Sequence, residues 1–134
     1  MNPFENWVAS DFREHAVNFC DLARVAYGLE LDFSAGTLAQ LDDLIDLNFA
    51  PGSADDHSDL IVGMGCYLGE VVIHNHGGGW HADEEFFHSP AVVIEGKLQT
   101  RTFPLSRVWR RFEYGPEHSL VAYYSEVCRT LARL

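Results

Sequence analysis

Four histidines lie within fifteen residues near the middle of the chain, and imidazole is a common ligand of divalent metal ions. They are His74, His76, His81 and His88. Three acids, at positions 83–85, stand among them. The spacing matches neither a helical His-Glu-x-x-His pattern nor a zinc finger. We therefore expect no metal cofactor and favour polar residues in a loop after a helix, with a divalent-metal site at these histidines as the alternative.

Glu70 is the second candidate, because it is the only charged residue in the apolar run from Leu60 to Ile73. A buried carboxylate must be ion-paired, hydrogen-bonded or neutral. It could serve as a general acid or base, but no second acid or nucleophile follows at a recognisable spacing. A structural role is favoured and no catalytic residue is predicted. The expected partners are the indole of Trp80 or one of three arginines, Arg107, Arg110 and Arg111.

Arginines gather around Trp109, at positions 101, 107, 110 and 111. Basic and aromatic residues interleaved in this way can contact nucleic acid. The net charge of −11 opposes such binding. We therefore predict that these arginines form ion pairs within the chain, with Glu70, Glu113 or the acids at 83–85.

Acidic residues are concentrated in the first half of the chain. Residues 1–60 carry twelve acids and two bases, whereas residues 61–134 carry eight acids and seven bases. A field of this sign repels nucleic acid and anionic lipid and attracts a basic protein surface. A merely solubilising surface is the alternative. The predicted partner-binding residues are Asp42, Asp43, Asp46, Asp55 and Asp56.

Two helices are predicted at the start. Residues 2–5, Asn-Pro-Phe-Glu, have the capping pattern of a helix start, and Gly28 can end that helix. A second helix begins near Ser34 and stops at Pro51-Gly52, with its acids at 42, 43 and 46 pointing away from its apolar side.

The long apolar run predicts a third, central helix. Ser53 and Asp56 form a capping-box pattern at its start, and it continues to about His76. Gly65 and Gly69 lie one turn apart, so we expect another backbone to approach closely there. Three glycines after His76 let the chain reverse direction.

The periodicity changes after this helix. Strands are predicted at Ala91–Ile94 and Lys97–Phe103, and a third near Trp80 or residues 86–87. Pro104 opens a short helix that Gly115-Pro116 ends. A closing helix is marked by Leu120, Tyr124, Val127, Leu131 and Leu134. The predicted fold is α+β, a single domain over residues 1–134, with three N-terminal helices, a small antiparallel sheet of two or three strands, and one or two C-terminal helices.

Other classes of protein are disfavoured by composition. The apolar run is too short and interrupted to span a bilayer. The absence of a basic, apolar leader predicts a cytoplasmic protein. The three scattered cysteines suit free thiols better than disulfides or a zinc knot.

The run Gly65-x-Tyr67-Leu68-Gly69-Glu70-Val71, followed by Gly78-Gly79-Trp80 and Pro90-Ala91-Val92-Val93, resembles families of small uncharacterised bacterial proteins known as domains of unknown function. The resemblance covers about residues 38–125. It supports the predicted fold and implies no catalytic residue, because such families have no assigned chemistry. Its motif residues are Gly65, Tyr67, Gly69, Glu70, Gly78, Gly79 and Trp80.

Some small acidic bacterial proteins of this general kind are immunity proteins that neutralise toxins. The sequence hypothesis is therefore a small acidic protein-binding module without catalytic activity. Its most specific form is an immunity-type protein that neutralises a basic toxin. The alternative is a metal-binding protein or metal-dependent enzyme that uses the four histidines.

Overall fold

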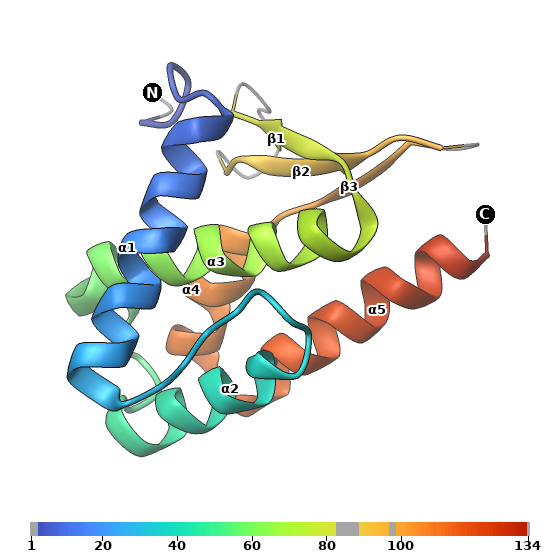
Figure 1. The fold of residues 1–134 in the computed structure, drawn as a ribbon. Coiled ribbons are helices and arrows are strands. Elements are labelled where there is room, and N and C mark those ends of the chain that lie inside the picture. Colours follow the sequence, from blue (N-terminus) through green and yellow to red (C-terminus); the bar gives the residue numbers. More distant parts are fainter. Residues whose placement is uncertain (1–2, 83–88, 97–98, 134) are drawn as a thin grey trace.

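The computed structural model describes residues 3–82, 89–96 and 99–133 (Figure 1). The described residues form five α-helices and a small antiparallel sheet, which lies at one edge of the helices in Figure 1, so the fold is α+β as predicted. No helix among the described residues is long and apolar enough to cross a membrane. In chain order the elements are α1 (Ala9–Tyr27), α2 (Thr37–Asn48), the 3-10 turn η1 (Ala54–His57), α3 (Ser58–His76), β1 (Gly79–His81), β2 (Ala91–Ile94), β3 (Thr100–Thr102), α4 (Pro104–Tyr114), the 3-10 turn η3 (Pro116–His118) and α5 (Leu120–Ala132).

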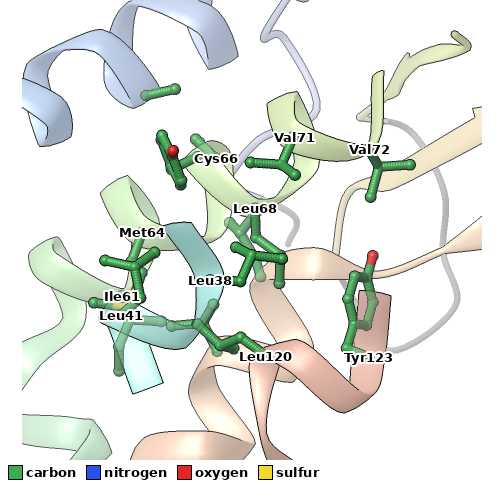
Figure 2. Close-up of a cluster of buried hydrophobic side chains, with 14 of the residues drawn as sticks. Leu38, Leu41, Ile61, Met64, Cys66, Leu68, Val71, Val72, Leu120 and Tyr123 are labelled. Atoms are coloured by element: carbon green, nitrogen blue, oxygen red, sulfur yellow. The ribbon is translucent and has the colours of Figure 1, made fainter. Parts of the chain in front are cut away.

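The central element is α3, as its apolar sequence predicts. Every residue from Met64 to Val72 is buried. Helices α1 and α4 both pack against α3, and α2 lies alongside α5 (Figure 1). Figure 2 shows side chains of α3 meeting Leu38 of α2 and Leu120 and Tyr123 of α5 in the core. A helix buried on several sides has little room for polar residues, which explains why Glu70 stands out.

Gly65 and Gly69 allow two close contacts on α3. A Cβ atom added at Gly65 would lie 2.8 Å from the Cα atom of Leu105 in α4. A Cβ added at Gly69 would overlap the six-membered ring of Trp80 in β1. The predicted close approach of another backbone is confirmed at Gly65, where the partner is α4, whereas at Gly69 the neighbour is the Trp80 side chain of β1. The approach of α1 to α3 lies elsewhere, beside Gly63.

The three strands pair in the order β1-β2-β3, and both pairings are antiparallel. Trp80 stands opposite Val92, and Val92 stands opposite Thr102. The strand near Trp80 and the strand Ala91–Ile94 are confirmed. Strand β3 is shorter than the predicted strand Lys97–Phe103. Within the described part of that range, only Thr100–Thr102 pairs.

A glycine turn connects α3 to the sheet. Gly77 and Gly78 have φ angles of +82° and +96°, a conformation that other residues rarely adopt. A Cβ at Gly78 would also lie 2.5 Å from the carbonyl oxygen of Val93. Both the backbone angle and the lack of space therefore require glycine at this turn.

The predicted start of the first helix is wrong: α1 begins at Ala9. The chain before it makes a turn in which the N–H of Trp7 donates to the carbonyl oxygen of Phe4 at 2.9 Å. The rings of these two residues meet edge to face, with 4.9 Å between their centroids. At the true start, the carboxylate of Asp11 accepts the N–H of Val8 at 2.8 Å. Aromatic packing has overridden the capping signal at residues 2–5.

The other helix ends agree with the sequence in part. Gly28, with a φ of +69°, closes α1 as predicted. The predicted capping box at Ser53 and Asp56 is wrong, because these residues lead into η1 and α3 begins at Ser58. The Ser53 hydroxyl is buried and has no hydrogen-bond partner among the described residues.

The buried side of α5 differs from the prediction at one position. Tyr123 is buried, whereas Tyr124 is only half-buried. Leu120 and Val127 are in the core as predicted, and Leu134 lies outside the described residues. The Ser119 hydroxyl accepts the N–H of Ala122 at 2.9 Å and caps this helix.

Candidate functional site

Glu70 is a buried carboxylate with two partners among the described residues. The indole Nε1 of Trp80 donates to its Oε2 at 2.7 Å, as predicted. Its second partner is Arg13 of α1, whose Nε lies 3.3 Å from Oε1. The predicted arginines of α4 are not its partners. Because the Arg13 side chain is 63 % exposed, water screens this ion pair, and the indole bond is the stronger restraint.

Tyr67 of the same motif holds the segment that connects α1 to α2. Its hydroxyl accepts the N–H of Phe33 at 3.0 Å and lies 2.7 Å from the hydroxyl of Thr37. Phe33 has a φ of +66° and its ring stacks on Tyr67, with centroids 4.9 Å apart. Burial raises the pKa of Tyr67, and its hydrogen bonds with Thr37 and Phe33 oppose that rise. The motif residues on α3 therefore organise the fold.

The histidines contact different parts of the molecule. His74 lines a hollow beside Arg13 and Glu70, whereas the Nε2 of His76 lies 3.0 Å from the Tyr124 hydroxyl of α5. His81 is exposed on β1, and His88 lies outside the described residues. Within residues 3–82, 89–96 and 99–133, no three metal-binding side chains come close enough to hold an ion. A metal site that includes His88 remains a prediction.

Asp42 is a structural residue that joins three helices. Its Oδ1 accepts from Nε of Arg111 in α4 at 2.9 Å and from the backbone N–H of Leu120 at 3.0 Å. Its Oδ2 accepts the N–H of Val121 at 3.1 Å. Asp42 therefore caps the start of α5 and binds α4. These contacts with α4 and α5 were not predicted from the sequence.

Arg111 is the cation at the centre of this joint. Its side chain is 2 % exposed, and its Nη2 also donates to Asp46 at 2.6 Å. Burial lowers the pKa of Arg111, but hydrogen bonds to Asp46 and Asp42 outweigh burial and raise it overall. The guanidinium is therefore firmly charged. Asp46 shares this internal ion pair, although half of its side chain is exposed.

The remaining arginines of α4 also differ from the prediction. Arg107 pairs with Glu126 of α5 at 3.2 Å, a partner that the sequence analysis did not name. Glu113 is instead close to the backbone N–H of Ala54, at 3.4 Å. The acids at 83–85 lie outside the described residues. The prediction of ion pairs within the chain is correct for Arg107 and Arg111, with different partners.

The other predicted partner-binding acids are exposed but lie apart. Asp43 borders a groove on α2, whereas Asp55 borders a separate hollow of about 540 Å³ between the start of α3 and α4. Asp56 is exposed on η1. Two of the five predicted residues, Asp42 and Asp46, therefore bind Arg111 within the chain, and Asp43 and Asp55 border different hollows.

An exposed apolar surface lies where the ends of α1 and α2 meet the start of α3, at the lower left of Figure 1. Three of its large apolar side chains are exposed: Leu47 at 83 %, Leu22 at 45 % and Tyr27 at 37 %. Tyr27 borders two grooves, of about 230 and 510 Å³, and stands between them. Asp43 borders the first groove and Asp59 the second. We call these five residues the apolar–acidic face.

Sequence reasoning found one residue of this face, Asp43. Leu47 could have been noticed, because it lies off the apolar side of α2 that Leu38, Leu41 and Ile45 define. Its position beside Tyr27 depends on how α1 packs, which no local pattern reveals.

The comparisons with known proteins found no match to the chain among protein-family models, curated proteins or solved structures. The resemblance stated above remains a prediction.

Proposed function

We propose that the protein is a binding module for a basic protein partner and that the apolar–acidic face is its docking surface. The observation that carries this proposal is the combination of exposed Leu47, Leu22 and Tyr27 with two acids, Asp43 and Asp59, along the same pair of grooves. Contiguous exposed apolar side chains with a polar rim are typical of protein interaction sites.

The acids of this face favour a positively charged partner. Asp43 and Asp59 are exposed and form no ion pair among the described residues, so they are available for an incoming cation. The surrounding half of the chain adds an attractive long-range field, because residues 1–60 carry ten more acids than bases. Such a field raises the rate of association with a cationic surface.

The shape of the grooves favours a helical partner. Two neighbouring grooves with apolar walls, both bordered by Tyr27, suit a helix that presents apolar side chains on one face and lysines or arginines beside them. Leu47 and Tyr27 are the expected anchors, because aromatic and large apolar side chains dominate the binding energy of interfaces. Neutralisation of a basic toxin by an immunity-type protein is the biological setting that we infer for this chemistry.

The experiment measures the affinity of a synthetic amphipathic helical peptide of lysine and leucine, with a glutamate–leucine peptide of the same pattern as the charge control. Calorimetry at about 0.15 M salt is suitable, because distant charges are screened beyond about 8 Å. The double variant Asp43→Lys/Asp59→Lys should bind the basic peptide about tenfold more weakly, since two attractions become repulsions. Leu47→Ser should also weaken binding without loss of stability.

The matched control is Glu95→Lys/Glu117→Lys, which changes the net charge equally at exposed sites outside the face. Its affinity for the basic peptide should stay within about twofold of the unmodified protein. Equal weakening by both double variants would show that only net charge matters. Tighter binding of the acidic peptide would contradict the proposed chemistry.

A further inference from the structure

The sulfur of Cys128 in α5 lies beside an imidazole of α3. The Sγ atom is 3.5 Å from Nε2 of His76, within hydrogen-bond reach for sulfur. The hydroxyl of Tyr124, one helical turn before Cys128, lies 3.0 Å from the same nitrogen. All three residues are half-buried, so the group is partly open to solvent. A thiol, an imidazole and a phenol hydroxyl from two helices therefore meet near the surface.

The position of His76 favours transfer of the thiol proton to its ring. The thiolate is the nucleophilic form of cysteine, and a neighbouring imidazolium stabilises it. His76 is the last residue of α3, where the partial negative charge of the helix end stabilises a nearby cation. Burial and the neighbouring Cys128 raise the pKa of Tyr124 to about 12, so this hydroxyl keeps its proton near pH 7. Cys128 is therefore the neighbour from which the imidazole takes a proton.

The other two cysteines are in different surroundings. Burial, followed by the charge of Glu70, raises the pKa of the Cys66 thiol to about 12. Burial, followed by the charge of Asp21, raises the pKa of the Cys20 thiol to about 11. Both therefore remain thiols near pH 7. Within the described part of the chain, Cys128 is the one cysteine that is hydrogen-bonded to a histidine.

Neither of these cysteines is near enough to form a disulfide with Cys128. Cys66 precedes His76 by ten residues on α3, which is about 15 Å along a helix axis. Cys20 is also remote, because its neighbour Phe19 contacts the first half of α3, far from His76 at its end. Disulfide-bonded cysteines have Cβ atoms about 4 Å apart. Any disulfide at Cys128 must therefore join it to another molecule.

We propose that Cys128 is a reactive thiol that forms a mixed disulfide with a small disulfide-containing molecule, with His76 as its proton acceptor. The thiol proton passes to Nε2 of His76, and the thiolate attacks one sulfur of the small disulfide. A bond forms between Sγ and that sulfur, the original S–S bond breaks, and the released thiolate takes the proton from His76. One disulfide is consumed and one is formed, so no other oxidant is needed. Because Cys128 is half-buried, a small molecule reaches it more easily than a second protein does.

The test follows the reaction of the reduced, full chain with dipyridyl disulfide, a neutral probe that releases a coloured product. Near pH 7 Cys128 should react before Cys20 and Cys66, and mass spectrometry of peptides identifies the modified residue. His76→Gln should slow the reaction of Cys128 by about three- to tenfold, because the smaller thiolate fraction outweighs the higher nucleophilicity of a less acidic thiol. Cys128→Ser should remove the fast phase. With glutathione disulfide, the product should be a chain with one glutathionyl group, at Cys128.

The matched control is His74→Gln, which changes an exposed histidine of the same helix that is not hydrogen-bonded to Cys128. Its rate should stay within about twofold of the unmodified protein, because solvent screens exposed charges. Rapid reaction of the buried Cys66 reveals any variant that has unfolded, and His76→Asn then replaces His76→Gln.

Three results would overturn the proposal. They are equal slowing by the two histidine variants, reaction of Cys128 no faster than that of Cys20, and a disulfide-linked dimer as the main product with glutathione disulfide. The apolar–acidic face shares no residue with this group, so either proposal can fail alone.

Discussion

The indole of Trp80 donates to the carboxylate of Glu70 at 2.7 Å and lies against Gly69, the residue before it. The Trp80 side chain therefore contacts two consecutive residues of α3. Gly69 leaves room for the indole ring, and Glu70 accepts its hydrogen bond. Gly78 lies in the turn just before the strand that brings the indole there. The motif of Gly69, Glu70, Gly78 and Trp80 is explained as a structural joint between helix and sheet.

This joint predicts how Glu70 variants behave. Glu70→Ala leaves the Trp80 N–H without an acceptor and should lower the free energy of unfolding by about 2–3 kcal/mol. Glu70→Gln keeps an acceptor oxygen and should lower it by about 1 kcal/mol or less. Urea unfolding followed by fluorescence measures both. Equal losses would mean that the ion pair with Arg13, and not the indole bond, fixes Glu70.

The space at Gly69 predicts an intolerance to any side chain. Gly69→Ala places a methyl group in the Trp80 ring and should lower the free energy of unfolding by about 1–3 kcal/mol or more. Gly36→Ala is the control, because a Cβ there meets nothing within 4 Å and the φ angle of −62° suits any residue. Thermal unfolding compares the two. A stable Gly69→Ala protein would show that Trp80 packs elsewhere.

Two neighbouring aspartates on α2 should differ sharply in their effect on stability. Asp42→Ala removes one of the two carboxylates that bind Arg111, whose side chain is 2 % exposed, and it uncaps α5. The expected loss is about 2–4 kcal/mol, from a lost charged hydrogen bond and a lost helix cap. Asp43→Ala should change stability by less than about 0.5 kcal/mol, because Asp43 is exposed. Chemical unfolding of both variants decides whether Asp42 belongs to the fold or to the binding surface.

Buried tyrosines predict a loss of stability at alkaline pH. Burial raises the pKa of Tyr123 above its ordinary value of 10, despite the opposing hydrogen bond with Thr102 and the nearby Arg107 charge. Above about pH 10 the unfolded chain loses this proton while the folded protein keeps it, so stability falls as pH rises, by up to about 1.4 kcal/mol per pH unit. In the Tyr123→Phe variant, the free energy of unfolding should fall less steeply between pH 9 and about 11. The variant should nevertheless be less stable than the unmodified protein at pH 7. An unchanged slope in that variant would contradict the burial of the hydroxyl.

The sequence predicts the elements with strong local signals. The apolar run of α3, the glycines at 65 and 69, the strand Ala91–Ile94 and the stop at Gly28 are all found, because short-range patterns determine them. The predicted start of α1 is wrong because residues before Ala9 form a turn, in which the rings of Phe4 and Trp7 pack on each other.

The candidate site was less predictable, because its residues are brought together by packing. Asp42 and Asp43 are adjacent acids on one helix, and only the position of Arg111 separates their roles. Arg13 reaches Glu70 across 57 positions of sequence, so no spacing rule indicates it. The exposure of Leu47 next to Tyr27 likewise depends on how the ends of α1 and α2 meet.

The most direct test of the proposed docking surface is a nuclear magnetic resonance titration of the isotope-labelled protein with the lysine–leucine peptide. The largest changes in amide chemical shift should lie at Tyr27, Asp43, Leu47 and Asp59, and they should disappear in Leu47→Ser. Changes spread evenly over all the acidic residues, or centred on the hollow beside Asp55 and Trp109, would contradict the account.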